Sequence, residues 1–281
     1  MVADSETGLP FMKMHGAGND FVVIDARLGG EGVSSDLCRA MADRHFGVGF
    51  DQLAIIEPSV NAELKLAFLN ADGSASAACG NATRCIARHV MDATEQDTLA
   101  IRTGRGALAA QRREGTVWIN MGQPMTAWRD IPIAKEADTL HLPLPGDPVA
   151  TSMGNPHCTF FVDDAEAAPI GVTGPEIERD PLFPERTNVQ MVSLTGPDRL
   201  RVRVWERGTG LTLASGSSSC AVTVAAHRRG LTDRAVQVDL DGGTLHVDWR
   251  EDGVWMTGPT AHVFTGTWHG AVLEDGQWRL P

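Results

Sequence analysis

The chain has 281 residues and a formal net charge of −12. Its length allows about two domains, and its 42% apolar and 21% charged residues are typical of a folded protein rather than a disordered one. The acidic balance disfavours binding to nucleic acid or to an anionic membrane, because both are bound through Lys and Arg. No stretch approaches the roughly 20 apolar residues that a membrane span needs.

The N-terminal stretch and the cysteines indicate the compartment. The first ten residues, MVADSETGLP, carry acids where a signal peptide would carry bases. Five cysteines are an odd number, which fits a reduced cytoplasm better than a disulfide framework. We therefore expect a cytoplasmic protein.

The first half of the chain is predicted to alternate short strands and helices. Apolar runs bounded by turn residues predict strands over residues 21–25, 52–57, 64–69, 98–102 and 116–121. A helix is predicted over 35–45, with Ser34 or Ser35 as its cap, and a second helix from Gly80 through Met91.

The pattern is interrupted over residues 122–148, which are rich in Pro and Ala and lack periodicity, so a domain boundary is expected there. After this segment the alternation resumes. Strands are predicted over 159–162, 189–192 and 200–205, a helix from Ser218 to Arg229, and a hairpin of 236–240 with 244–249 around Asp241-Gly242-Gly243.

One internal similarity links the two halves. Residues 78–90 read ACGNATRCIARHV and residues 214–227 read ASGSSSCAVTVAAH, so the two segments begin 136 residues apart. Each segment passes from Ala, a small polar residue and Gly into a helix of small residues. The spacing is about half the chain, which indicates two similar halves; chance likeness of two helix starts is the alternative.

The position of Cys79 at the start of a helix suggests chemistry. A helix N-terminus presents unpaired N–H groups and the positive end of a dipole, which bind carboxylate or phosphate and stabilise a thiolate. A lone cysteine is also commonly a small buried apolar residue. A zinc site is disfavoured, because Cys79 and Cys85 are spaced more widely than a zinc pair, and no phosphate-binding loop or serine-hydrolase motif is present.

Six motifs together resemble the diaminopimelate epimerase family over residues 11 to 268. They are Met14-His15-Gly16-Ala17-Gly18-Asn19-Asp20-Phe21, Gly49-Phe50-Asp51-Gln52, Asn70-Ala71-Asp72-Gly73-Ser74, Cys79-Gly80-Asn81, Met153-Gly154-Asn155-Pro156-His157 and Glu206-Arg207-Gly208.

The resemblance implies an α/β (α+β) fold of two pseudo-symmetric domains, each a sheet wrapped around a central helix. The expected halves are residues 1–122, joined by a returning segment 262–281, and residues 123–261. The family interconverts LL- and meso-diaminopimelate for lysine and peptidoglycan precursor synthesis. It uses no pyridoxal phosphate and no metal, so no cofactor is expected.

The resemblance also implies the roles of individual residues. Inversion at Cα needs a base on one face and an acid on the other, and the family uses two cysteines, each at a helix N-terminus. Cys79 matches one of them. The expected substrate-binding residues are Asn19, Gln52, Asn70, Gly80, Asn81, Asn155, His157, Asn188, Glu206, Arg207, Gly216 and Ser217.

The second catalytic cysteine of the family is replaced by Ser215. A hydroxyl is far less acidic than a thiol, and three interpretations stay open. The chain is an epimerase that uses Cys79 and Ser215; or a one-base lyase, dehydratase or racemase acting on another amino acid; or a binding protein with impaired catalysis. We favour the first, because the polar contact positions suit a diamino dicarboxylate. The resemblance also implies a homodimer, with no nucleic acid or membrane partner.

Overall fold

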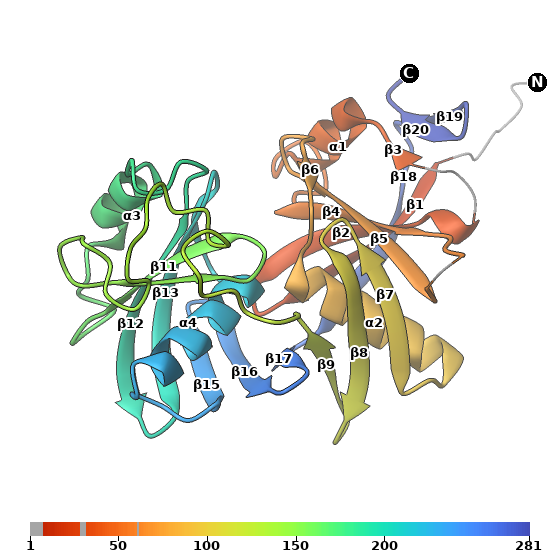
Figure 1. Ribbon diagram of the computed structural model, residues 1–281. Helices are drawn as coiled ribbons and strands as arrows, with labels where there is room; N and C mark the ends of the chain where they lie inside the picture. The colour runs from red at the N-terminus through yellow and green to blue at the C-terminus, as the bar shows by residue number, and fades with distance from the viewer. Residues whose placement is uncertain (1–7, 29–31, 61) are drawn as a thin grey trace, which may run out of the picture. The chain divides into compact units, whose positions relative to one another are not determined.

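The computed structural model describes residues 8–28, 32–60 and 62–281, which divide into two compact units. Unit 1 contains the described residues of 1–16, 20–111 and 260–281, and unit 2 contains residues 17–19 and 112–259. The expected α/β fold is confirmed, because each unit combines one continuous set of paired strands with a central helix (Figure 1).

The strands of unit 1 pair in an order that differs from their order in the chain. In spatial order they are β18 (Ala261–Trp268), β1 (Leu9–Gly16), β2 (Asn19–Asp25), β4 (Gln52–Glu57), β5 (Leu64–Asn70), β7 (Thr98–Thr103) and β8 (Gly106–Arg113). The short β6 (Ala75–Ser76) also pairs with β5. The C-terminal strand β18 thus pairs with the first strand of the chain.

Helix α2 (Gly80–Thr94) is the central helix of unit 1. Nine of its residues are buried, and it packs against β1 and β7. Figure 1 shows α2 next to β7. Helix α1 (Ser35–Ala42) is capped by the Ser34 hydroxyl and contacts β4. The 3-10 turn η1 (Ala26–Leu28) follows β2. A small sheet of β3 (Gly32–Val33), β20 (Gln277–Arg279) and β19 (Val272–Glu274) completes the unit.

Unit 2 is arranged around helix α4 (Gly216–Arg228), ten of whose residues are buried. Its strands in spatial order are β10 (Val149–Ser152), β11 (Pro156–Phe161), β12 (Asn188–Gly196), β13 (Arg199–Glu206), β15 (Ala235–Leu240), β16 (Gly243–Arg250), β17 (Gly253–Thr257) and β9 (Thr116–Asn120). The short β14 (Gly210–Thr212) pairs with β13, and α3 (Ile170–Glu178) packs on β12 and β13.

The strand register confirms that the two halves are a structural repeat. From β2 to β8, and again from β11 to β16, successive neighbours pair parallel, antiparallel, parallel and antiparallel. Phe21 faces Gln52 in β2 and β4, and His157 faces Asn188 in β11 and β12. Both members of the second pair lie 136 residues after those of the first, the same spacing that separates Cys79 from Ser215.

The irregular segment over residues 122–148 is a packed part of unit 2. The structure describes no helix in it, and Met125 makes one isolated bridge to Ser152. Ile131, Ile133 and Leu142 are nonetheless almost fully buried in the core that also holds Phe160. Apolar side chains anchor this segment although its backbone is not periodic.

The structure differs from the sequence-based expectations in several places, and β1, β17 and α3 are among the elements that were not predicted. The helix predicted over 35–45 ends at Ala42, because the Asp43 carboxylate accepts the N–H groups of His45 and Phe46 and turns the chain. Strand β8, another element that was not predicted, is the hairpin partner of β7. Strand β9 pairs with β17 instead, which groups residues 112–122 with unit 2 rather than with the N-terminal half.

The part of the chain that the structure describes holds no helix long and apolar enough to cross a membrane.

Candidate active site

Cys79 is the N-cap residue of α2, as the sequence predicted from its position before Gly80. Its backbone is extended, with φ −141° and ψ 107°, and its sulfur accepts the N–H of Ala82 at 3.4 Å. The side chain is 8% exposed. A sulfur that caps a helix lies at the positive end of the helix dipole, where a thiolate is stabilised.

Other cysteines of the chain are in a different setting. Burial raises the pKa of the Cys38 thiol to about 11, and burial likewise raises the pKa of the Cys85 thiol to about 11. Burial also raises the pKa of Cys158 well above its usual value. These three thiols are therefore neutral near pH 7. Cys85 donates to the carbonyl oxygen of His15 at 3.3 Å, which is a structural role.

Two predicted binding residues of unit 1 are hydrogen-bonded to each other. Gln52 and Asn70 are direct neighbours across β4 and β5, and Nε2 of Gln52 donates to Oδ1 of Asn70 at 3.0 Å. The same Gln52 nitrogen lies 3.2 Å from the hydroxyl oxygen of Ser76. Both amides are half-buried at the strand ends that lead toward the Cys79 loop.

Gly80 and Asn81 form the first turn of α2. Helix N-termini offer backbone N–H groups to anions, which fits the predicted contact with a substrate carboxylate. The Asn81 side chain is 2% exposed and accepts from the fully buried guanidinium of Arg84 at 3.0 Å. The sequence analysis did not identify Arg84; a charged residue in a run of small apolar helix residues was the available signal.

Ser215 occupies in α4 the position that Cys79 occupies in α2. Its backbone is extended, with φ −136° and ψ 118°, and the side chain is 5% exposed. The hydroxyl makes no capping bond to the helix and donates instead to Oε2 of Glu206 at 3.0 Å. Gly216 and Ser217 follow as the first residues of α4. The two cap residues thus have the same extended backbone conformation, but their side chains make different hydrogen bonds.

Asn155, His157 and Ser217 are brought together in unit 2. Oδ1 of Asn155 lies 3.0 Å from Nε2 of His157, and its Nδ2 donates to the Ser217 hydroxyl at 3.4 Å. The other ring nitrogen of His157, Nδ1, lies 3.0 Å from the amide nitrogen of Gln190. Gln190 was not predicted as a site residue, although it is the one polar residue within the apolar strand predicted over 189–192.

Asn188 and Arg207 are joined through the main chain. The backbone N–H of Arg207 donates to Oδ1 of Asn188 at 2.9 Å, while Nδ2 of Asn188 donates to the carbonyl oxygen of Pro156. The exposed Arg207 guanidinium donates to the carbonyl oxygen of Glu185. Asn188 therefore holds the chain at the end of β13, where Glu206 is the last strand residue and Arg207 follows it.

Asn19 follows a tight turn that packs in unit 2. Ala17 and Gly18 both have positive φ, 52° and 79°, and a Cβ on Gly242 would lie 2.0 Å from the carbonyl oxygen of Ala17. This close approach places the turn against the β15–β16 hairpin. The binding roles predicted for these residues in both units stay predictions.

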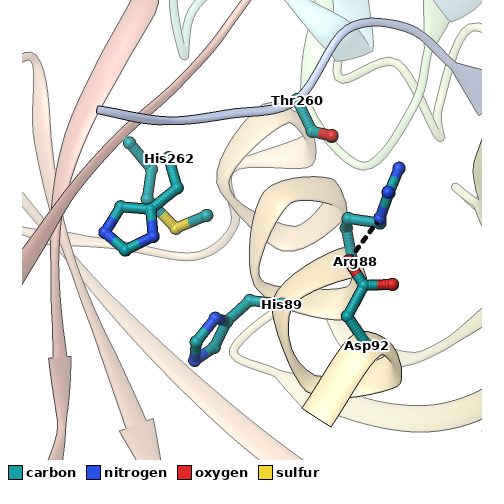
Figure 2. A pocket seen from close by; sticks show the side chains of 6 residues that line it. Arg88, His89, Asp92, Thr260 and His262 are labelled. Atoms are coloured by element: carbon teal, nitrogen blue, oxygen red, sulfur yellow. Dashed lines mark hydrogen bonds and ion pairs between the residues drawn. The ribbon is translucent and has the colours of Figure 1, made fainter. Parts of the chain in front are cut away.

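A cavity in unit 1 lies apart from the Cys79 loop. It has a volume of 270 Å³ and is lined by Met14, Arg88, His89, Asp92, Thr260 and His262. Figure 2 shows Arg88 and Asp92, which form an ion pair at 2.6 Å, with His89 on the same helix. Because α2 rises about 1.5 Å per residue, His89 lies roughly 15 Å along the helix from Cys79. This cavity does not hold the predicted site residues.

Comparison with known proteins decides the family. The family model described as "Diaminopimelate epimerase" matches residues 11–126 and 149–263. The chain belongs to the diaminopimelate epimerase family.

Members of this family are similar to the chain over nearly its whole length. The diaminopimelate epimerase of Acidiphilium cryptum is 52% identical over 94% of this chain and 98% of that protein, and that of Rhodospirillum centenum is 48% identical over 91% of both. The gap in the family match, residues 127–148, falls within the irregular segment that packs on the core of unit 2.

Solved structures with little sequence identity share the fold. A phenazine biosynthesis protein of the PhzF family from Bacillus anthracis has a TM-score of 0.66 at 16% identity, covering 93% of this chain and 99% of that one. A hydroxyproline epimerase from Agrobacterium vitis has a TM-score of 0.65 at 14% identity, covering 92% of this chain and 90% of that one. The diaminopimelate epimerase fold of two similar halves is therefore common to these proteins.

Proposed function

We propose that this chain interconverts LL- and meso-diaminopimelate by removing and returning the proton at Cα. The observation that carries the proposal is 52% identity to a diaminopimelate epimerase over 94% of the chain. The two residues expected to move the proton, Cys79 and Ser215, also begin the central helices of the two structural repeats. No observation favours a lyase or a binding protein without turnover.

The proposed chemistry uses one proton-transfer group on each face of Cα. The thiolate of Cys79 removes the proton from one isomer, and the hydroxyl of Ser215 delivers a proton to the opposite face. The N-terminal amides of α2 and α4, at Gly80 and Gly216, take the α-carboxylate and stabilise the negative charge that develops at Cα. These assignments rest on the family resemblance and on the local geometry of each helix start.

The remaining polar positions are proposed to recognise the diamino diacid. Guanidinium and amide N–H groups suit carboxylates, while a carboxylate and amide oxygens suit ammonium groups. Both kinds of group are present among the predicted contact residues, of which Arg207 is exposed and the others are half-buried or buried. The predicted contacts are Asn19, Gln52, Asn70, Asn81, Asn155, His157, Asn188, Glu206, Arg207 and Ser217.

The test is a direct assay of epimerisation. Circular dichroism of LL-diaminopimelate incubated with the purified chain should change as the meso isomer forms, and in D₂O the label should enter at Cα. Cys79→Ser keeps a capping side chain but loses the thiolate, and should lower kcat by about 100-fold or more, the usual effect of removing a general base. Ser215→Cys, which restores the family residue, should remain active.

A matched control distinguishes loss of the Cys79 thiolate from loss of folding stability. Cys85→Ser changes another thiol on the same helix, whose hydroxyl can still donate to the carbonyl oxygen of His15. It should keep kcat, and any loss should appear as lower stability. No optical change and no deuterium at Cα from either isomer, with a folded protein, would refute the proposed activity.

We further propose that the protein acts in the cytoplasm as a homodimer. The product is a precursor for lysine and peptidoglycan synthesis, which start from cytoplasmic metabolites. Mass measurement in solution, at the protein concentration of the assay, tests the oligomeric state; a monomer with full activity would contradict it.

A further inference from the structure

Arg84 is a fully buried cation in the second turn of helix α2. Its side chain is 0% exposed, and among the described residues it is the largest of the fully buried side chains. A guanidinium stays protonated in proteins, and burying a charge costs free energy unless other groups stabilise it. An apolar side chain would fill this place at a lower cost. The position therefore indicates a use for the charge.

The guanidinium of Arg84 is tied to the first turn of the helix. Its Nη1 donates to Oδ1 of Asn81 at 3.0 Å, in a buried hydrogen bond. Asn81 is the second residue of α2 and is 2% exposed. With a rise of about 1.5 Å per residue, Asn81 lies roughly 3 Å along the helix axis from Cys79, and Arg84 lies about 7.5 Å from it. The bond thus brings the charge back toward the end of the helix at which Cys79 lies.

Cys79 is held at the same end of the helix. Its sulfur accepts the N–H of Ala82 at 3.4 Å, and its carbonyl oxygen accepts the Thr83 hydroxyl at 2.8 Å. The N-terminus of a helix already carries about half an elementary positive charge. A full positive charge buried nearby adds to it and is screened less by salt than a surface charge. Both charges favour a thiolate over a thiol at Cys79.

The next residue shows that the charge of Arg84 acts on a thiol. Burial raises the pKa of Cys85 to about 11, and the positive charge of Arg84 opposes that rise. The other charged or titratable groups of α2 and of the two strands packed on it are Lys13, His15, Arg88, His89, Asp92 and Arg102.

None of these six groups combines burial with a bond to the helix start, as Arg84 does. Lys13 is paired with Asp20, and Arg102 is exposed. His15 is half-buried on β1, where its carbonyl oxygen accepts the thiol hydrogen of Cys85. The three groups further along α2 begin about 13 Å or more from Cys79 along the helix axis.

The second repeat has no charge at the corresponding place. The residue 136 positions after Arg84 is Cys220, which is buried. The carbonyl oxygen of Ser215 accepts the Ser219 hydroxyl at 2.9 Å, just as that of Cys79 accepts a hydroxyl in α2. The two central helices therefore hold their cap residues by the same backbone bond, whereas only α2 has a buried cation in its second turn.

We propose that Arg84 is a positioning residue that keeps Cys79 in the thiolate form, with its buried charge held at the helix start by Asn81. This inference rests on the proposed epimerase function, in which the thiolate of Cys79 removes the proton at Cα. Arg84 exchanges no proton itself. Loss of its charge should leave Cys79 in place but raise the fraction of neutral thiol, which cannot act as a base.

Alkylation by iodoacetamide tests the proposal without requiring turnover, because the thiolate is the form that reacts. The rate is measured as a function of pH, and peptide masses identify the label on Cys79. Arg84→Gln keeps an N–H donor for Asn81 but loses the charge, so the pH of half-maximal alkylation should rise by about one unit. Arg84→Lys keeps a charge and should show less than half of that rise. An unchanged midpoint in folded Arg84→Gln, or an equal rise in both variants, would overturn the proposal.

Two further variants complete the alkylation experiment. Arg88→Gln removes an exposed guanidinium of the same helix, one that is paired with Asp92, and should leave the midpoint unchanged. Asn81→Ser shortens the acceptor and releases the guanidinium without removing the buried charge, so it remains informative if Arg84→Gln does not fold. Its midpoint should rise by less than that of Arg84→Gln, and no rise at all would contradict the proposal.

The pH profile of epimerisation gives a second readout. In Arg84→Gln the acid limb of kcat/KM should move to higher pH with the alkylation midpoint, and activity should recover as the pH is raised. A loss of the same size at every pH would mean that Arg84 only supports the fold, and would overturn the proposal. If the natural chain does not epimerise diaminopimelate but the alkylation midpoint still shifts, the proposed function fails while the effect of Arg84 on Cys79 stands.

Discussion

The side-chain amide of Gln190 donates a hydrogen to Nδ1 of His157 at a distance of 3.0 Å. Because Nδ1 accepts, the remaining ring hydrogen lies on Nε2, which donates to Oδ1 of Asn155 at 3.0 Å. The Asn155 amide nitrogen is thereby directed to the hydroxyl oxygen of Ser217. A buried glutamine on β12 thus sets the orientation of an amide that is predicted to bind substrate.

Gln190→Leu should therefore reduce both stability and substrate binding. The substitution removes the bonds of Gln190 to His157, Thr159 and Ser218, all fully buried. Buried polar groups left without partners cost about 1–3 kcal/mol each, so we expect the free energy of unfolding to fall by about 2–4 kcal/mol and KM to rise. Urea unfolding and steady-state kinetics measure the two effects. Thr159→Val removes only the bond between the Thr159 hydroxyl and Oε1 of Gln190, and leaves the bond from Gln190 to His157. If it lowers stability as much as Gln190→Leu does, the bond from Gln190 does not hold His157.

Gly242→Ala should displace the turn that carries Asn19. A Cβ at this position would lie 2.0 Å from the carbonyl oxygen of Ala17, a backbone atom that cannot yield without moving the turn. We expect a loss of about 1–3 kcal/mol in stability and a rise in KM for the substrate. Gly171→Ala on α3, where the added Cβ meets nothing within 4 Å, is the control and should be neutral or slightly stabilising. An unchanged KM in Gly242→Ala would remove Asn19 from the substrate contacts.

Asp20 should stabilise the fold at neutral pH and lose this effect in acid. Burial acts to raise the pKa of this carboxyl, but the hydrogen bonds and charges of Arg44 and Lys13 outweigh burial and lower the pKa below its usual value. A lowered carboxyl pKa gives stability that is complete above the unfolded pKa, near 3.8, and is lost as pH falls through the folded pKa. Asp20→Asn should therefore cost stability at neutral pH and progressively less below about pH 4. Urea unfolding across pH 3–7 tests this; a constant difference across that range would contradict it.

His89 should destabilise the fold as the solution becomes mildly acidic. Burial, and next the nearby His262, lower the pKa of His89 below 6.5, although Asp25 and Asp92 oppose this. The unfolded chain then binds a proton at a higher pH than the folded one, so stability falls as pH drops below about 6.5 toward the folded pKa. His89→Gln should lose less stability than the natural chain between pH 7.5 and pH 5. Parallel stability curves for the two proteins would show that burial of His89 has no such effect.

The secondary structure and the repeat were readable in the sequence because they rest on local patterns. Apolar runs predicted β4 over residues 52–57 with its observed bounds, and the Gly after Cys79 marked the start of α2. Helix α4 was predicted from Ser218 and begins two residues earlier, at Gly216. The likeness of residues 78–90 to 214–227 predicted a duplication that strand register confirms. These features depend on neighbours in the chain, so one sequence carries them.

The hydrogen-bond partners were decided only by the tertiary structure. Glu206 and Ser215 were both predicted site residues, but the bond between them depends on how β13 leads into the start of α4. Gln190 meets His157 because β11 and β12 pair in parallel with a particular register, which no local pattern specifies. Strand β9 likewise joined β17, more than a hundred residues later in the chain. The periodicity of a sequence predicts which residues are buried. Which buried polar groups form hydrogen bonds with each other depends on how the strands pair and pack, because that brings together residues far apart in the chain.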